Sequence, residues 1–390
     1  MVLLSIVDLG YSERLLELRE RAAALASFLM VYEEECETNA GLSADCLADL
    51  HSAVRKHGLQ AINMPEEWGG AGLSSLEQVI VCEEIGKLTN GLWDVVWRPA
   101  NALLACTSEQ RERWLLPCIT GERREAVAIT EPGGGSDPQA LATTAERIGD
   151  RFRLTGEKWF VTAGDHADFL LVLATVPGEG ATMFLVDKDL PGVRMSRVPA
   201  YMHNFVFEHP EFVFEEVELG SQHVLGHVGA GYDLTRAWFA AERLSTGARA
   251  IGAAERALAL AVDWARHRLQ RGEPIISFQL VQAMIADSAV DIALNRAFIH
   301  QVAPEFDGEG RAKTLHAKAA MVKLSATEAA GRVVDRAVQI FGGRGYMREQ
   351  PVERLYRDVR LDRICEGTSE IQRLIIANEV AKRGLSALIS

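Results

Sequence analysis

The segment Arg363–Arg373, RICEGTSEIQR, places a carboxylate on a turn directly ahead of a predicted helix. Glu366 is followed by a glycine and two hydroxyl residues, and apolar residues then recur at helical spacing from Ile371. Thr368 or Ser369 is therefore the expected helix cap. A carboxylate held on such a turn suits general-base chemistry. The same residues also fit an exposed glutamate that only interacts with the helix dipole.

A second segment with ligand-binding character is Thr130–Asp137, TEPGGGSD. Its three consecutive glycines let a backbone approach a ligand closely, and Thr130 and Ser136 add hydroxyl groups. The spacing is not that of a dinucleotide-binding or P-loop motif. By composition alone, the segment fits either a ligand-binding loop or an ordinary turn.

Together with Gln339–Tyr346, QIFGGRGY, these two segments resemble the acyl-CoA dehydrogenase family, from about residue 12 to about residue 384. The resemblance implies an FAD-dependent enzyme that introduces an α,β double bond into an acyl-CoA thioester. Glu366 would remove the α-proton, hydride would leave the β-carbon for flavin N5, and an electron-transfer flavoprotein would take the electrons. The alternatives are an acyl-CoA oxidase of the same fold and a non-catalytic flavin-binding member.

The resemblance also assigns the cofactor contacts. Thr130 would meet the pyrimidine edge of the flavin, Phe160 would cover its face, and Thr162 would lie near N5. Arg268 and Gln279 would hold the pyrophosphate and adenosine part, since the guanidinium fork suits phosphate. The motif at Gln339–Tyr346 would reach the FAD of a neighbouring subunit, so the protein is expected to be a homo-oligomer, a dimer or a tetramer. The full expected set of FAD contacts is Thr130, Ser136, Phe160, Thr162, Arg268, Gln279, Gln339, Gly343, Thr368 and Glu370.

On the substrate side, the resemblance places Ser136, Arg243 and Gly367 against the acyl-CoA. Several positions depart from the family pattern. Gly134 replaces a common alanine, Phe160 a common tryptophan and Cys365 a common tyrosine. Ala240 replaces a common aspartate near the CoA, and Arg271 a phenylalanine near the adenine.

Two glutamates are candidates for the base. Glu366 matches the usual family position, whereas Glu242 matches the position that the isovaleryl-CoA and long-chain branches use; we favour Glu366. Cys365 is interpreted as pocket lining because no basic partner is near it in sequence. Arg98 is either a surface residue or a partner for a substrate carboxylate, and the acyl group remains open among straight, branched, cyclic and dicarboxylic chains.

The composition limits the class of protein. The chain has 390 residues, of which 48% are hydrophobic and 24% charged, and its net charge is −13. These values indicate a soluble multidomain protein and disfavour nucleic acid or an anionic membrane as the main partner. Six scattered cysteines predict free thiols in a reducing cytoplasm, with neither disulfides nor a metal site. No apolar run is long enough for membrane insertion.

The order of patterns predicts an α+β multidomain fold. Residues 1–120 form an N-terminal α-helical domain, with helices expected at 13–29, 43–57 and 76–85. Residues 121–230 contain short strand-like runs separated by turn signals, which predict a β-barrel or sandwich. Two of these runs, 152–155 and 158–162, are separated by an expected turn at Gly156-Glu157. Residues 231–390 return to helical periodicity and predict a C-terminal four-helix bundle, with Gly247 and Gly252 as close-packing points. Its helices are expected at 232–269, 278–300, 312–341 and 371–382.

Overall fold

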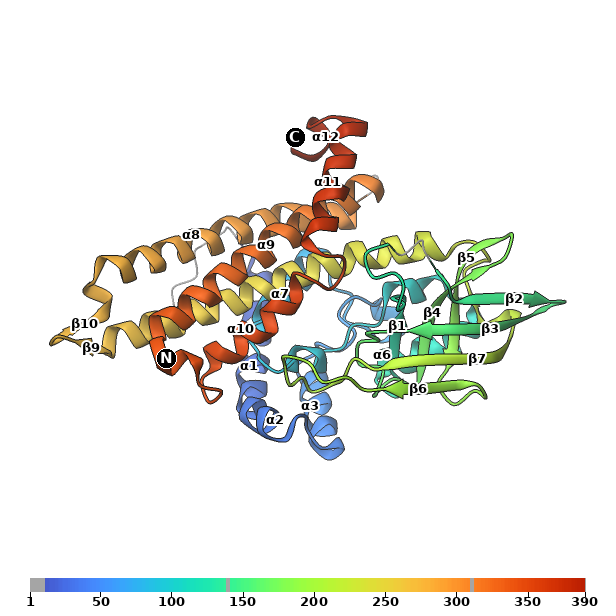
Figure 1. Cartoon of the computed structure of the whole chain (residues 1–390), viewed down its shortest axis with the longest axis horizontal. Coiled ribbons are helices and arrows are strands. Elements are labelled where there is room, and N and C mark those ends of the chain that lie inside the picture. The colour runs from blue at the N-terminus through green and yellow to red at the C-terminus, as the bar shows by residue number, and fades with distance from the viewer. Residues whose placement is uncertain (1–10, 138–140, 309–311, 390) are drawn as a thin grey trace.

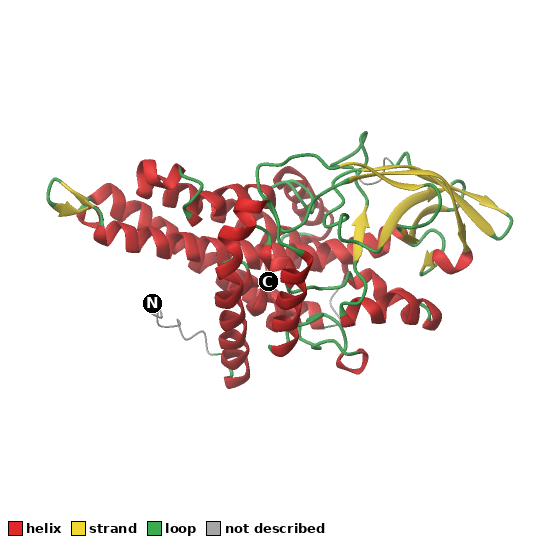
Figure 2. Ribbon diagram, turned by 90° about the horizontal axis from the view of Figure 1, so that it is seen from below, coloured by secondary structure: helices red, strands yellow, loops and turns green. Residues whose placement is uncertain are grey.

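The computed structural model describes residues 11–137, 141–308 and 312–389 (Figure 1). A curved β-sheet lies at one end of the elongated molecule and long helices lie at the other, with shorter N-terminal helices packed along the middle (Figure 2). Within those described residues, no helix is both long and apolar enough to cross a membrane.

The N-terminal helices begin where the sequence predicts. Ser12, Ser43 and Ser74 cap three of them through side-chain oxygens that accept backbone N–H bonds. A capping box between Thr107 and Gln110 starts a fourth. The elements are α1 (Glu13–Leu29), α2 (Glu33–Asn39), α3 (Ala44–Lys56), α4 (Ser75–Ile85), α5 (Ser108–Gln110) and α6 (Leu116–Thr120).

The β domain is a single sheet with strand order β6-β7-β3-β2-β4-β5-β8, and β1 pairs with β4. Both β1 and β2 run parallel to β4, whereas the other pairings in this sheet are antiparallel. Apolar side chains such as Phe184 and Phe212 fill its interior. The strands are β1 (Glu125–Ala128), β2 (Thr144–Ile148), β3 (Arg151–Lys158), β4 (Phe169–Val176), β5 (Gly180–Asp187), β6 (Val193–Arg197), β7 (Glu211–Gly220) and β8 (Val224–Leu225).

One expectation in this domain is wrong. The sequence predicts two strands separated by a turn at Gly156-Glu157, and the structure has the single strand β3 with a register irregularity between Leu154 and Gly156. The chain leaves the sheet after Lys158, so the run 159–162 is not a strand. Phe160 there has a φ of 56°, which a regular strand excludes. The bulge and this kink turn Phe160 away from the sheet core.

The long helices are α7, α8 and α9, which lie side by side in Figure 1. Helices α10 and α11 pack on α9, and α4 packs on α7. Gly252 is a close-packing point as predicted, because a Cβ there would lie 1.9 Å from the Glu83 carbonyl oxygen of α4. Gly247 plays the same part against Val322 of α9. The elements are α7 (Gly231–His267), β9 (Leu269–Gln270), β10 (Glu273–Pro274), α8 (Gln279–Val302), α9 (Ala312–Phe341), α10 (Pro351–Asp362), α11 (Ser369–Arg383) and α12 (Ser386–Ile389).

Helix α10 was not expected from the sequence, because arginines interrupt its apolar stripe. Arg354 and Arg357 are nevertheless buried, and they pair with Glu33 and Glu37 of the N-terminal helix α2. A buried, paired arginine looks like a surface residue in a one-dimensional hydropathy pattern. These pairs join the first and last parts of the chain.

Candidate active site

The predicted catalytic turn lies between α10 and α11 and is held by other helices. Thr368 caps α11 by accepting a bond from the Ile371 N–H. Of the two expected caps, Thr368 and Ser369, the structure therefore uses Thr368. The Glu366 carbonyl accepts bonds from Arg243 Nε of α7 and from Gln372 Nε2 of α11, both at 3.0 Å. The Gly367 carbonyl accepts a 2.8 Å bond from Lys323 Nζ of α9. Three helices therefore fix the backbone of the turn by its carbonyl oxygens.

The Glu366 side chain is not used in this anchoring. Among the described residues, its Oε2 atom is buried without a hydrogen-bond partner. The φ of Glu366 is 53°, in the left-handed region, so the turn presents this side chain at some conformational cost. Burial, reinforced by the negative charge of Glu242, raises the pKa of Glu366 to about 7. Near neutral pH the carboxyl group therefore exists in both protonation states.

Glu242, the alternative base, is already engaged. Its Oε1 atom lies 3.2 Å from Nη1 of Arg98, and only 9% of the Arg98 side chain is exposed. Arg98 is thus not a surface residue, and its charge is balanced from within the protein. An ion-paired carboxylate is a weaker base than a desolvated one without a partner. This geometry favours Glu366 over Glu242 as the proton acceptor.

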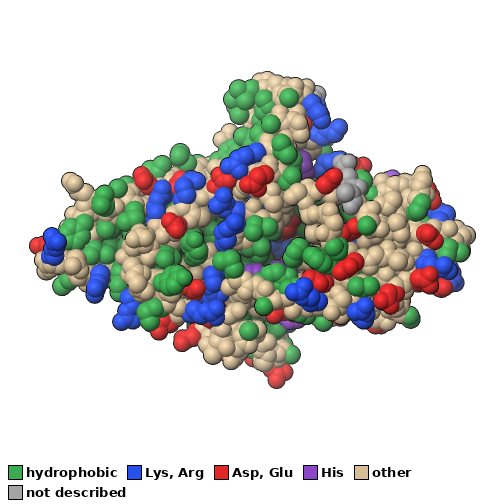
Figure 3. Space-filling view, viewed as in Figure 1, with side chains coloured by type: hydrophobic (Ala, Val, Ile, Leu, Met, Phe, Trp, Pro, Cys, Tyr) green, Lys and Arg blue, Asp and Glu red, His purple; other side chains and the backbone are tan. Residues whose placement is uncertain are grey.

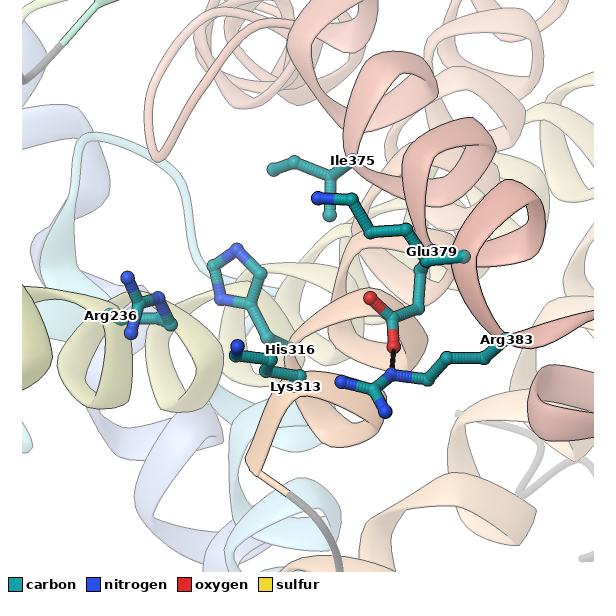
Figure 4. A pocket seen from close by; sticks show the side chains of 7 residues that line it. Arg236, Lys313, His316, Ile375, Glu379 and Arg383 are labelled. Atoms are coloured by element: carbon teal, nitrogen blue, oxygen red, sulfur yellow. Dashed lines mark hydrogen bonds and ion pairs between the residues drawn. The ribbon is translucent and has the colours of Figure 1, made fainter.

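Arg243 connects the catalytic turn with a cavity on its other side. It is buried, and burial lowers its pKa to about 10. Its Nη1 atom lies 3.1 Å from Nε2 of His316, which lines a cavity of about 270 Å³ between α7, α9 and α11 (Figure 4). Burial and Arg243 lower the pKa of His316 to about 4, so this ring is neutral.

The cavity is strongly basic. Its lining comprises Arg236, Lys313, His316, Ile375, Glu379, Lys382 and Arg383. Arg383 pairs with Glu379, and Arg236 pairs with Asp233. Within the described part of the chain, neither Lys313 nor Lys382 forms an ion pair. Four cations facing one carboxylate in a protein of net charge −13 make a local site for an anionic group.

On the β-domain side, the structure brings the two segments predicted to contact flavin next to each other. The Thr130 carbonyl accepts a 2.8 Å bond from the Trp159 N–H. Phe160 follows with half of its surface exposed, and Thr162 is exposed beside it. Ser136 is also exposed, further along the glycine-rich loop. Phe160 and Thr162 thus present a ring and a hydroxyl group outward, as a planar ligand with a polar edge requires.

The support behind these two segments was not predicted. Lys158 is buried and pairs with Glu131 at 2.6 Å, and Glu131 also accepts bonds from two backbone N–H groups of residues 142 and 143. Behind Thr162 lies His209, whose Nδ1 atom is 3.1 Å from the threonine Oγ1. Neither pairing has a sequence signature, because the partners are separated by 27 and 47 residues.

The remaining predicted FAD residues lie elsewhere. Arg268, Gln279, Gln339 and Gly343 are exposed and cluster at the far end of the helices, where Trp264 of α7 stacks on Phe341 of α9 at 4.9 Å. Arg268 follows Arg243 by 25 residues along α7, which is about 37 Å of helix. Most of the length of α7 therefore separates Arg268 from Arg243, which binds the Glu366 turn. Thr368 and Glu370 remain with Glu366, on the capped end of α11.

The residues around Thr162 fit an isoalloxazine ring. Phe160 offers an apolar face, Thr162 a hydroxyl, and a Cβ added at Gly133 or Gly135 would meet nothing within 4 Å, so the loop leaves open space. Thr130 supplies a second hydroxyl at the start of that loop. These features are those that the resemblance assigns to a flavin site.

The sequence matches three family descriptions in chain order. These are the N-terminal domain of acyl-CoA dehydrogenase at residues 12–122, its middle domain at 126–217 and its C-terminal domain at 229–381. Acryloyl-CoA reductase (NADH) of Anaerotignum propionicum is 36% identical, covering 84% of each chain. The caffeyl-CoA reductase–Etf complex subunit CarC of Acetobacterium woodii is 33% identical, covering 85% of this chain and 89% of the relative. The structure of butyryl-CoA dehydrogenase from Megasphaera elsdenii superimposes with a TM-score of 0.88 at 28% identity, covering 96% of this chain and all of the other (100%).

Proposed function

The chain belongs to the acyl-CoA dehydrogenase family of FAD-dependent oxidoreductases, and we propose that Glu366 is the residue that removes the α-proton of its acyl-CoA substrate. The observation that carries this assignment is the Glu366 carboxyl oxygen, which is buried without a partner and belongs to a group of pKa about 7. A base of this kind is strong enough to accept a proton, and a substantial fraction of it is ionised near neutral pH.

FAD, when bound, supplies the acceptor for the hydride that leaves the β-carbon. The chain contributes the geometry. Thr130, Phe160 and Thr162 would hold the flavin ring, while Arg243, Lys323 and Gln372 fix the turn that carries the base. The Gly367 backbone and Ser136 would contact the thioester and the CoA chain. Positioning of this kind is what shortens the path between base and substrate.

The same groups serve the reverse reaction. A carboxyl of pKa about 7 is present in both forms at neutral pH, so protonated Glu366 can return a proton to the α-carbon of an enoyl thioester. Two of the relatives above are described as acryloyl-CoA and caffeyl-CoA reductases. We therefore propose that the direction of turnover is set by the electron partner and not by the acid–base group.

An electron-transfer flavoprotein is the partner that we propose, because one relative is described as a subunit of a reductase–Etf complex. Reoxidation of the reduced enzyme by such a protein under anaerobic conditions, with no peroxide formed in air, would support a dehydrogenase. Rapid peroxide formation would identify an oxidase. The six free cysteines support a reducing compartment, and we propose the cytoplasm.

The acyl group that we propose is not a dicarboxylic one. Arg98, the candidate partner for a substrate carboxylate, is already neutralised by Glu242 at 3.2 Å. A substrate carboxylate next to Arg98 would lose its hydration without gaining an unpaired cation as partner, which is unfavourable. Straight, branched and cyclic monocarboxylic acyl groups remain compatible with the site.

The deciding experiment mixes the FAD-loaded protein anaerobically with a panel of acyl-CoAs and measures the loss of absorbance of the oxidised flavin. The assignment would be supported if an acyl-CoA bleaches the wild-type flavin and the rate of bleaching is about 10²–10⁴-fold lower in Glu366→Gln. General-base catalysis contributes a factor of this size. Glu242→Gln is the matched control and should still bleach. If the flavin still bleaches in Glu366→Gln but not in Glu242→Gln, the base is Glu242 of α7. FAD content of each variant distinguishes lost chemistry from lost cofactor.

The basic cavity behind Arg243 is where we propose that the phosphate-bearing end of the CoA binds. The test compares an acyl-CoA with its 3′-dephospho and pantetheine counterparts. Removing phosphate should raise KM by about tenfold or more with little change in kcat, since a charge-assisted bond contributes about 1.5–3 kcal/mol. Lys313→Met with Lys382→Met should reduce the advantage of acyl-CoA over the dephospho substrate. An unchanged preference in the double variant would place the phosphate elsewhere.

A further inference from the structure

Two buried histidines lie directly behind the exposed hydroxyl of Thr162. His209 Nδ1 is 3.1 Å from Thr162 Oγ1, and His209 Nε2 is 3.1 Å from His203 Nε2. His203 and His209 are only 8% and 6% exposed. A continuous chain of hydrogen bonds therefore runs from the exposed hydroxyl into the protein, through two imidazole rings.

Packing fixes both rings. His203 lies between Phe205, whose ring centre is 3.7 Å away, and Tyr201, which is stacked parallel to it at 5.5 Å. The His209 ring packs edge-on against the rings of Tyr201 and Phe207, at 5.1 and 5.4 Å. The Tyr201 hydroxyl also donates a 2.8 Å bond to the His209 carbonyl. Because the rings are clamped, a change in this chain has to move protons and not side chains.

Each ring carries one proton at neutral pH. Burial lowers the pKa of His203 to about 3, with His209 and Arg357 acting in the same direction. Burial lowers the pKa of His209 to about 4, against the opposing effect of the Asp165 and Asp94 carboxylates. The contact between the two Nε2 atoms is a hydrogen bond only if one of them is protonated and the other is not. Two neutral arrangements satisfy this condition.

The two arrangements have opposite effects on Thr162. If His203 donates from Nε2, His209 carries its proton on Nδ1 and donates to Thr162, whose own O–H is free to donate outward. If His209 donates from Nε2, its Nδ1 accepts the Thr162 proton, and the threonine oxygen is free to accept from outside. Both arrangements hold one proton on each ring and one on the threonine, so no net proton is gained or lost.

We propose that His203 and His209 are positioning residues that switch Thr162 between hydrogen-bond donor and acceptor toward flavin N5. The inference rests on the proposed function, in which Thr162 faces N5. That atom accepts a hydrogen bond in oxidised flavin and carries a hydrogen in reduced flavin, so it needs a different partner in each state. The histidine pair offers both partners without moving a heavy atom.

The test is ¹⁵N NMR of histidine-labelled, FAD-loaded protein, before and after anaerobic reduction with dithionite, which requires no substrate. The expected oxidised state has His209 protonated on Nδ1 and His203 on Nε2. In the reduced state, both protons should move, to Nε2 of His209 and Nδ1 of His203. The ratio of the two arrangements should change by about tenfold, the equilibrium equivalent of one hydrogen bond. Signals are assigned with His209→Gln and His203→Phe, the latter preserving the stack with Tyr201.

Thr162→Val supplies the discriminating control, because it removes the hydroxyl that couples the rings to the flavin. The histidine signals of Thr162→Val should no longer respond to reduction. Those of Thr155→Val, a matched substitution in the preceding strand β3, should respond as the wild type does. If reduction of FAD-loaded wild-type protein leaves the protonation sites of both histidines unchanged, the role inferred for His203 and His209 is wrong, while the proposed function is unaffected. Failure of the protein to retain FAD would overturn this inference together with the proposed function, and failure of the Glu366→Gln test would leave the NMR result unaffected.

Discussion

At the scale of single residues, the basicity that we propose for Glu366 depends on which of its groups the neighbouring donors bind. Arg243, Lys323 and Gln372 bond to the carbonyl groups of its turn, so the nearby donors are used by the backbone. The carboxyl oxygen is left buried and unpaired. The same cations directed at the carboxylate itself would lower its pKa and weaken it as a base.

The pH dependence of activity follows from this arrangement. Because the base must be ionised, kcat/KM for dehydrogenation should rise as the pH increases through about 7. Glu242→Gln removes a negative charge that raises the pKa of Glu366, so the rise should move to lower pH, and activity at pH 6 should increase by at least about twofold. Glu255→Gln, a carboxylate further along α7, is the control and should leave the profile unchanged. A profile unaffected by Glu242→Gln would show that the two carboxylates are not coupled.

Much of the catalytic turn was predictable, because its signals are local. The glycine after Glu366, the hydroxyl cap at Thr368 and the helical spacing that follows all lie within one turn of each other in sequence. The pairing of Arg98 with Glu242 and that of Thr162 with His209 were not predicted, because in each case the partners are distant in the chain. Spacing along a sequence contains no information about such contacts.

At the scale of elements, the predicted helices α1, α3, α4, α7, α8, α9 and α11 are confirmed. Most of them bury apolar residues against neighbouring elements. The buried residues of α11 are instead Ser369, Gln372 and Glu379, so its prediction rested on its cap and its helical spacing. The strand prediction at residues 158–162 is wrong beyond Lys158, where β3 ends. The chain turns there, with Phe160 at a φ of 56° and exposed while Val161 remains buried. Short strands such as β2 and β6 carry mostly exposed residues and lack the alternation that would reveal them.

The contact between α4 and α7 gives an element-scale prediction. In Gly252→Ala, the new Cβ would lie 1.9 Å from the Glu83 carbonyl oxygen, so the two helices must separate. We expect a loss of about 1–3 kcal/mol in the free energy of unfolding, measured by urea denaturation. Gly331→Ala is the matched control in α9, where the nearest atom lies at 3.8 Å, and it should stabilise the protein by about 0.4–1 kcal/mol. Equal stability of the two variants would contradict the packing argument.

At the scale of the whole molecule, the exposed apolar surface and the divided FAD residues indicate the same assembly. Hydrophobic side chains gather over the helical end of the molecule, opposite the β domain (Figure 3). Leu280, Val290 and Leu294 of α8 are more than half exposed there. Arg268, Gln279, Gln339 and Gly343 lie at the same end. A second copy of the chain that covered this surface would bring those four residues to its own flavin, which is the homo-oligomer that we propose.

Subunit mixing tests this assembly directly. Glu366→Gln removes the base, and Arg268→Ala with Gln279→Ala weakens the distal FAD contacts, so each oligomer alone should be inactive. If the two groups act in one site from different chains, a mixed dimer contains one site with an intact base and intact distal contacts. Random mixing should then restore about a quarter of the wild-type activity. If the subunits exchange but no activity is recovered, each active site must be built from one chain. That result would contradict the assembly proposed from the separation of about 37 Å between Arg243 and Arg268.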